Sequence, residues 1–215
     1  MTDSNYVIAA VDFVATEKKA AAFFNESASS LFIIPGFIAA DKNNVTTTLG
    51  RGGSDYTAAI LAAAVNAAVL EIWTDVSGMM TADPRLVNNI KHIPQISYQE
   101  AMELSHFGAK VIYPPTIQPV MKKGIPVWIK NTFAPEEPGT VIKNEATATG
   151  TSIQGISSIN SIVLLSLEGS GMVGIPGFSK RLFEALANAS INVILITQGS
   201  SEHSICVGVD EYASA

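Results

Sequence analysis

The densest set of chemically capable residues is a glycine-rich segment, LGRGGSDYTAA, over residues 49–59. Arg51 carries a planar guanidinium that suits a carboxylate or a phosphate. The glycines permit unusual backbone angles, and the positive end of a following helix favours an anion. Arg51 and Asp55 can grip an amino acid by its carboxylate and its ammonium. An ordinary glycine turn, with Ser54 or Asp55 capping the helix and Arg51 on the surface, explains the same pattern equally well.

A second polar cluster, WTDVSGMMTADPR over residues 73–85, follows an apolar segment that is typical of a strand. In open α/β sheets, ligands bind beyond the carboxyl ends of the strands. Arg85 can meet a phosphate there, and Asp75 a ribose hydroxyl or a metal-bound water. The alternative is structural, because Asp75 can cap one turn while Asp83 and Pro84 start another.

A third segment, HFGAKVIYPPT over residues 106–116, places Lys110 between a helix-closing glycine and an apolar strand. A lysine there can reach a phosphate as a mobile point charge, although a solvated lysine is the simpler interpretation of this segment alone. The three histidines, His92, His106 and His203, lack the spacing of a metal site. No protein-held metal is expected.

The elements that must position these residues alternate along the chain. Helices are predicted over residues 12–27, 55–68, 97–106 and 116–123, and strands over residues 31–37, 69–73, 126–130 and 139–142. A capping box of Ser97 and Glu100 begins the third helix. This alternation predicts a sheet covered on both faces by helices.

A polar segment without apolar periodicity, KNEATATGTS over residues 143–152, is typical of a linker. It divides the chain into a first domain, residues 1–142, and a second, residues 153–215. The second domain has the order strand, helix, strand, strand, in SIVLLSLEG, GFSKRLFEALANAS, INVILITQG and HSICVGV. One face of its helix is predicted to carry five apolar residues: Phe178, Leu182, Phe183, Leu186 and Ala187.

The composition and the net charge limit the classes of function that this protein can have. The chain has 215 residues, of which 47% are hydrophobic, and a net charge of −6, so it offers no basic surface for nucleic acid. Its single cysteine, Cys206, cannot form an internal disulfide and is expected on a buried strand in a reducing compartment. No run of about 18 apolar residues predicts a membrane span. A cytoplasmic protein without membrane or nucleic-acid partners is expected.

Four segments in this order resemble the aspartate kinase branch of the amino-acid kinase family: GRGGSDYTAA, EIWTDVSGMMTADPR, SYQEAMELSHFGAKVIYPPT and IPVWIKNTFAPEEPGT. The resemblance implies an α/β fold, the C-terminal part of an amino-acid kinase αβα sandwich. It also implies transfer of the γ-phosphate of ATP, with its Mg²⁺, to the side-chain carboxylate of L-aspartate.

The same resemblance implies a role for each residue of the three clusters. Arg51, Ser54 and Asp55 are expected to hold aspartate, and Arg51 and Lys110 to act in catalysis. The nucleotide is expected to lie against five residues: Thr74, Asp75, Met80, Arg85 and Lys110.

Beyond the linker, the sequence resembles a partial ACT domain, a ferredoxin-like βαββαβ module that binds amino-acid effectors. LITQGSSEHSI is similar to the form in threonine-inhibited bifunctional aspartokinase–homoserine dehydrogenases. This similarity implies that Gln198 contacts threonine and that the parent protein is a homo-oligomer assembled through its ACT domains.

Two departures from the family pattern set further expectations. Met80 stands where many relatives carry an aromatic residue that contacts adenine, and a thioether can still pack on a base. Residues 1–215 contain no match to the lysine- and glycine-rich KFGG strand that contacts the transferring phosphate. The chain is therefore expected to be a fragment that is inactive alone. The alternatives are a catalytically silent amino-acid sensor and another amino-acid kinase.

Overall fold

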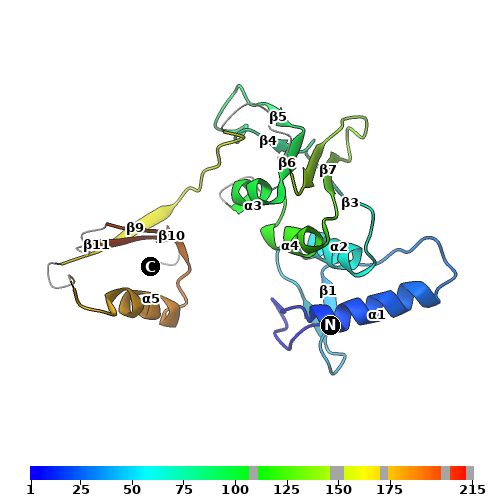
Figure 1. Ribbon diagram of the computed structural model, residues 1–215, viewed down its shortest axis with the longest axis horizontal. Coiled ribbons are helices and arrows are strands. Elements are labelled where there is room, and N and C mark those ends of the chain that lie inside the picture. Colours follow the sequence, from blue (N-terminus) through cyan, green and yellow to red (C-terminus); the bar gives the residue numbers. More distant parts are fainter. Residues whose placement is uncertain (107–110, 146–152, 170–173, 200–203, 212–215) are drawn as a thin grey trace. The chain divides into compact units, whose positions relative to one another are not determined.

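The computed structural model describes residues 1–106, 111–145, 153–169, 174–199 and 204–211. The chain separates into two compact units, Met1–Ser158 and Ile159–Ala215 (Figure 1). The predicted linker, residues 143–152, lies mostly outside the described residues, so its bounds stay a prediction.

The first unit begins with helix α1 (Phe13–Glu26), as predicted. Asp12 caps it by accepting a hydrogen bond from the Ala15 backbone N–H at 3.0 Å. The prediction of a buried strand over residues 31–37 is wrong, because this segment forms no strand and Ile33 is 93% exposed. Pro35 has no backbone N–H to donate to a partner strand, which disfavours this segment as an interior strand of a sheet. The apolar residues of the segment lie on the surface instead. A short antiparallel pair follows, β1 (Ile38–Ala40) and β2 (Thr46–Thr48).

Helix α2 (Gly53–Ala64) and strand β3 (Leu70–Thr74) follow the glycine-rich segment. The predicted helix ran to residue 68, but the observed helix ends earlier, since Asn66 adopts a left-handed conformation with φ of 49°. A left-handed residue cannot continue a right-handed helix. Strand β3 therefore starts only a few residues after α2, and its carboxyl end leads into the second polar cluster.

The first unit holds a four-stranded sheet in the order β3, β7 (Val127–Asn131), β8 (Thr140–Lys143) and β6 (Gln95–Ser97). Strand β7 runs parallel to β3 and antiparallel to β8, which runs parallel to β6. Burial alternates along the strands, and one face carries the core residues Leu70, Ile72, Val127, Ile129 and Ile142. A two-residue pair, β4 (Met79–Met80) with β5 (His92–Ile93), was not predicted, because it is too short to produce an alternating pattern.

Two further helices, α3 (Tyr98–His106) and α4 (Pro114–Lys123), complete the first unit. The predicted capping box is confirmed: Ser97 N–H donates to Glu100 Oε2 at 2.9 Å, and Glu100 N–H donates to Ser97 Oγ at 3.2 Å. Gly124 closes α4 in a left-handed conformation. Helices α2 and α4 lie side by side (Figure 1), so the start of α4 can reach the start of α2.

The second unit has the predicted βαββ order: β9 (Ile162–Glu168), α5 (Phe178–Asn188), β10 (Val193–Gln198) and β11 (Ser204–Asp210). Its three strands form an antiparallel sheet in the order β10-β11-β9. Four of the five predicted apolar residues of α5 pack on Ile205, Val207 and Val209, whereas Ala187 is exposed, so its placement on that face was wrong. Cys206 lies on strand β11, as predicted, but its side chain is only half-buried.

Candidate active site

The glycine-rich segment forms a tight turn whose backbone only glycine adopts without strain. Gly50 and Gly52 have φ of 72° and 68°, and Gly52 is the N-cap of α2. Within the described part of the chain no side chain caps this helix, so the prediction of a cap by Ser54 or Asp55 is wrong. Both residues already lie inside the first turn, past the position from which a side chain caps. The helix N-terminus is therefore left for another partner.

Two opposite charges lie on this turn. Arg51 is exposed and Asp55 is half-buried, and among the described residues neither side chain forms a hydrogen bond or an ion pair. Burial raises the pKa of the Asp55 carboxyl, because the charged form loses hydration. An ammonium group beside Asp55 would compensate this loss. A ligand with one positive and one negative end therefore fits the turn.

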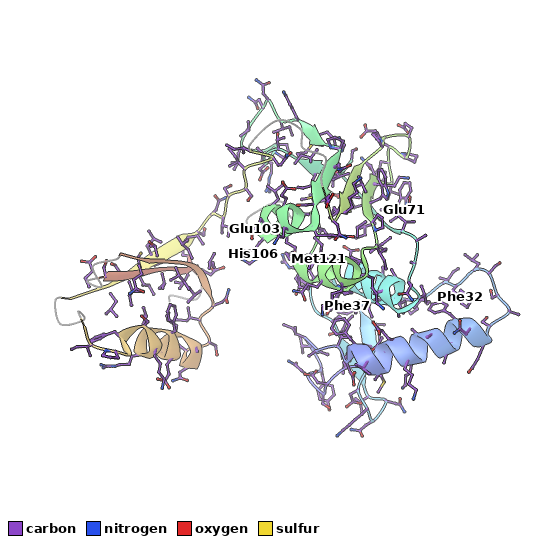
Figure 2. The ribbon with its side chains drawn as sticks, viewed as in Figure 1. Phe32, Phe37, Glu71, Glu103, His106 and Met121 are labelled. Carbon is purple, nitrogen blue, oxygen red and sulfur yellow. The ribbon has the colours of Figure 1, made fainter. Side chains whose placement is uncertain are left out.

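The turn is held in place by close packing on several sides. A Cβ on Gly52 would lie 2.5 Å from the Cβ of Tyr113, the residue that precedes α4, and a Cβ on Gly36 would lie 2.8 Å from the Cα of Ser54. Phe37, labelled in Figure 2, contributes its backbone N–H, which donates to the hydroxyl of Thr57 at 3.1 Å. Substituting either glycine would displace the turn, so its shape depends on these two positions.

Tyr113 brings part of the third sequence cluster against the first. Burial raises the pKa of Tyr56 on α2, and the nearby Tyr113 raises it further. Lys110, the predicted catalytic residue of this third cluster, lies outside the described residues. Its role stays a prediction.

The second cluster begins at the carboxyl end of β3, where β7 also ends. Thr74 pairs in register with Asn131, and the Thr74 hydroxyl donates to Asp75 Oδ1 at 3.1 Å. The Asn131 amide donates to Ser77 Oγ at 2.8 Å, and the backbone N–H of Thr132 donates to the Thr74 carbonyl at 2.8 Å. The end of β7 thus holds the first residues of the loop, at the sheet edge where ligands bind in open α/β sheets.

Met80 and Arg85 occupy the later part of the Asp75–Arg85 loop. Met80 is half-buried on β4. Arg85 forms a two-pronged ion pair with Asp83, its Nη2 lying 2.7 Å from Oδ2 and its Nε 3.0 Å from Oδ1. This guanidinium lowers the pKa of Asp83 to about 2, so the pair is intact at neutral pH. The Arg85 side chain is 79% exposed, which leaves it accessible to a phosphate.

The structure thus separates the predicted site residues into two groups. Arg51, Ser54 and Asp55 share one turn, whereas Thr74, Asp75, Met80 and Arg85 lie in and beside another loop. Among the described residues, no hydrogen bond or ion pair joins the groups. Sequence reasoning missed three supporting residues: Tyr113, Asn131 and Thr140, whose buried hydroxyl accepts a hydrogen bond from the Met79 backbone N–H in the loop. Only Asn131 gave a usable signal, as a polar residue at the end of a predicted strand.

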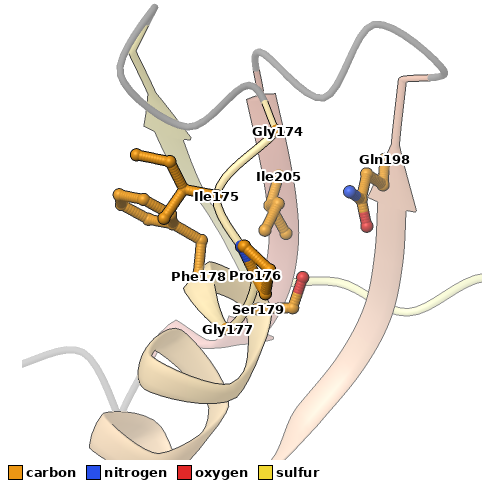
Figure 3. A pocket seen from close by; sticks show the side chains of 8 residues that line it. All are labelled: Gly174, Ile175, Pro176, Gly177, Phe178, Ser179, Gln198 and Ile205. Atoms are coloured by element: carbon orange, nitrogen blue, oxygen red, sulfur yellow. The ribbon is translucent and has the colours of Figure 1, made fainter.

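A pocket of about 290 Å³ lies in the second unit, between the start of α5 and the sheet (Figure 3). Gln198, at the end of β10, lines it together with Ile205, its register partner on β11. Its other lining residues are Gly174, Ile175, Pro176, Gly177, Phe178 and Ser179. Gly177 precedes α5 with φ of 96°, and no side chain of the described residues caps the helix. The pocket therefore offers a carboxamide, a hydroxyl and an uncapped helix N-terminus.

The part of the chain that the structure describes sets two limits on the site. No group of three or more His, Cys, Asp or Glu side chains in that part of the chain could hold a metal ion. None of its helices has the length and hydropathy that a membrane crossing requires.

The comparisons with known proteins agree with the two units. Residues 8–131 match the amino acid kinase family, and residues 165–214 match the ACT domain. The chain belongs to the amino acid kinase family and carries an ACT domain after its kinase region. This confirms the resemblance and the fold class predicted from the motifs.

Within this family the chain is similar to aspartokinases. It is 46% identical to the bifunctional aspartokinase/homoserine dehydrogenase of Haemophilus influenzae over 187 residues, 86% of this chain and 23% of the relative. It is 41% identical to the lysine-sensitive aspartokinase 3 of Escherichia coli over 184 residues, 86% of this chain and 40% of the relative.

A solved structure extends the similarity to the fold. The crystal structure of E. coli aspartokinase III in complex with aspartate and ADP superposes with a TM-score of 0.83 at 38% identity. That match covers 97% of this chain and 46% of the other. The chain therefore spans less than half the length of each of these three relatives.

Proposed function

We propose that this chain is part of an aspartate kinase, which transfers the γ-phosphate of ATP to the side-chain carboxylate of L-aspartate and gives 4-phospho-L-aspartate. The observation that carries the proposal is the pair of opposite charges on one glycine turn. Arg51 and Asp55 form no hydrogen bond or ion pair among the described residues, and Asp55 is half-buried. An α-amino acid satisfies both charges at once.

In this reaction the turn holds the acceptor. Arg51 binds a carboxylate of aspartate, Asp55 binds its ammonium, and Ser54 adds an exposed hydroxyl. Attack by a carboxylate oxygen on a γ-phosphate brings two negative groups together, so cations and positioned donors supply most of the catalysis. Arg51 and Lys110 are the proposed cations, and no covalent enzyme intermediate is required.

The Asp75–Arg85 loop holds the nucleotide in this proposal. Thr74 and Asp75 take the ribose or a metal-bound water, Met80 packs on the base, and Arg85 binds a phosphate. Because Arg85 is paired with Asp83 at 2.7 Å, it must exchange this carboxylate for the phosphate. Mg²⁺ arrives with the nucleotide and shields the phosphate charge. The E. coli aspartokinase III complex contains ADP, which supports ATP as the phosphate donor.

The test is identification of the product. The full-length protein that contains this chain is incubated with Mg·ATP and aspartate, and the acyl phosphate is trapped with hydroxylamine as a hydroxamate. Aspartyl hydroxamate is expected, and glutamate or carbamate in place of aspartate should give none. ATP turnover with glutamate or carbamate but not with aspartate would instead support another amino-acid kinase.

We propose further that residues 1–215 alone do not catalyse this reaction. The support is the lack of a KFGG-type segment among them, which in the family contacts the transferring phosphate. Removing a cation that faces developing charge costs on the order of a hundredfold or more in rate. Robust aspartate-dependent ADP release by these residues alone would contradict this.

For the second unit we propose binding of threonine as a feedback effector, in a parent protein that is a homo-oligomer through its ACT domains. Gln198 supplies both a donor and an acceptor, which suits a hydroxyl or a backbone group. No carboxylate is among the described residues that line the pocket, so a lysine ammonium finds no counter-charge there. This favours threonine over lysine, the effector in the name of the E. coli relative.

Gln198→Ala tests the effector assignment in the full-length protein. We expect threonine inhibition to weaken by about threefold to tenfold, the value of one hydrogen bond, with uninhibited activity unchanged. Thr197→Ala is the matched control, since Thr197 pairs with Cys206 and does not line the pocket. An unchanged threonine inhibition curve would contradict the role of Gln198. Inhibition by lysine but not by threonine would mean that lysine is the effector. Threonine binding without ATP or aspartate binding would instead indicate a silent sensor.

A further inference from the structure

A buried hydroxyl, that of Thr140, contacts the Asp75–Arg85 loop from strand β8. Thr140 begins β8 and is fully buried, with a relative exposure of 0%. Its Oγ1 accepts a hydrogen bond from the Met79 backbone N–H at 2.8 Å and donates to the Ile93 carbonyl at 2.6 Å. The His92 Nε2 lies 3.3 Å from the same oxygen. Thr140 thus contacts both strands of the β4-β5 pair, of which β4 belongs to the loop.

The hydrogen-bonding capacity of this hydroxyl is filled. A threonine hydroxyl has one proton to donate and two lone pairs to accept with. The proton goes to Ile93 and Met79 donates to one lone pair, which leaves the second lone pair facing His92 Nε2 at 3.3 Å. Because Thr140 is also fully buried, its hydroxyl is a support for the loop and not a substrate contact.

Gly78 shows how closely the loop is fitted to this support. Its φ is 114°, and a Cβ added there would lie 2.8 Å from the backbone nitrogen of Thr140 and 2.9 Å from His92 Nε2. The backbone therefore approaches Thr140 at a distance that only glycine permits. From the other side, Asn131 holds Ser77 at 2.8 Å. The loop residues between Asp75 and Met80 are thus fixed from two strands.

We propose that Thr140 is a positioning residue for the nucleotide, acting through the Asp75–Arg85 loop. This inference rests on the proposed role of the loop in nucleotide binding. Loss of the hydroxyl leaves the Met79 N–H and the Ile93 carbonyl buried without a partner, so the loop relaxes and the side chains of Asp75 and Met80 lose their placement. Aspartate binding on the separate glycine turn is unaffected.

The test uses Thr140→Val, which keeps the shape and removes the hydroxyl, in the full-length protein. Calorimetric binding of Mg·ATP should weaken by at least about tenfold, while aspartate binding stays within about twofold. Thr140→Ser, which restores the hydroxyl, should bind Mg·ATP within about threefold of the wild type. Hydrogen exchange should show faster exchange of the Met79 amide in the valine variant only.

Thr116→Val is the matched control, because Thr116 is equally buried and its hydroxyl has no hydrogen-bond partner among the described residues. It should change neither binding constant. If Thr140→Val does not fold, Ser77→Ala removes the Asn131 contact at a half-buried position and should also weaken Mg·ATP binding selectively.

Three outcomes would overturn the inference: unchanged Mg·ATP binding by folded Thr140→Val, equal weakening of aspartate binding, or no Mg·ATP binding by the wild type. Failure of the proposed function looks different. A wild type that binds Mg·ATP but does not phosphorylate aspartate would remove that function, and the effect of Thr140 on nucleotide binding would still be measured.

Discussion

The glycine turn and the Asp75–Arg85 loop reach their functional form in different ways. The turn is built by backbone packing, with Gly52 against Tyr113, and its charged side chains bind no other described residue. The loop is built by side-chain hydrogen bonds, and its guanidinium is already paired with Asp83. Under the proposed function, a ligand adds contacts at the turn but replaces contacts at the loop. The first region is then preorganised for its ligand, whereas the second exchanges one partner for another.

The largest effect is expected at the turn, from Arg51→Ala in the full-length protein. A charged hydrogen bond is worth about 1.5–3 kcal/mol, so kcat/KM for aspartate should fall by about tenfold to a hundredfold. Because the guanidinium also orients the acceptor, kcat should fall too. Arg51→Lys should not restore the activity, since lysine lacks the planar fork. Steady-state kinetics that stay within about twofold of the wild type would limit Arg51 to a structural role.

The backbone of the turn gives the second prediction. Gly52→Ala should cost about 1–2 kcal/mol from its positive φ and about 1–3 kcal/mol more from the clash with Tyr113. Gly124→Ala is a matched control, because Gly124 has nearly the same φ of 67° but its nearest neighbour for a Cβ is Asn144 at 3.5 Å. Urea unfolding should show the larger loss for Gly52→Ala. Equal losses would mean that the contact with Tyr113 does not support the turn.

The half-buried carboxylate of the turn gives a pH dependence. Burial raises the pKa of Asp55, so its charge is lost at a higher pH than for an exposed aspartate. Asp55 must be ionised to bind an ammonium, and aspartate binding should weaken as the pH falls through this raised pKa. The sign for stability is opposite, since neutral Asp55 is the better buried form and stability is lost as the pH rises through the same pKa.

Titration of aspartate binding against pH, with Asp55→Asn as the control, checks this sign. The variant should bind weakly at every pH and lose the pH dependence. A wild type whose aspartate binding strengthens as the pH falls would contradict the role of Asp55.

The smallest effect is expected at the loop, from Asp83→Asn. The substitution removes the charge that holds Arg85, and an exposed ion pair of this kind is worth about 0–1 kcal/mol. KM for ATP should therefore fall by up to about fivefold, because Arg85 no longer has to leave a carboxylate. Arg85→Ala in the same kinetic assay should raise KM for ATP. If Asp83→Asn raised it as well, the ion pair would be part of the binding form of the loop.

Local features of this fold could be predicted from the sequence, and long-range contacts could not. The capping box of Ser97 and Glu100 and the apolar face of α5 depend on residues three or four positions apart, which the sequence displays directly. The support of the loop by Thr140 joins residues 48 and 61 positions apart in the chain. Nothing in the local pattern around Thr140 indicates such a contact.

In the candidate site, too, residue types could be read from the sequence, whereas the contacts between residues could not. The types and order of Arg51, Asp55, Thr74 and Asp75 predict two ligand-binding segments in the chain, and their binding roles stay a prediction. The pairing of Arg85 with Asp83 could not be predicted, since the same residues can equally form a phosphate contact. The mistaken strand over residues 31–37 has a similar cause, because an apolar run without a partner strand looks the same in the sequence as a buried one.

The central claim, that the glycine turn and not the loop holds the phosphate acceptor, is tested most directly by equilibrium binding of aspartate without nucleotide. The measurement compares the wild-type full-length protein with Arg51→Ala and Arg85→Ala. The account predicts that Arg51→Ala weakens aspartate binding by at least about tenfold and that Arg85→Ala leaves it within about twofold. Loss of aspartate binding in Arg85→Ala, with normal binding in Arg51→Ala, would contradict it.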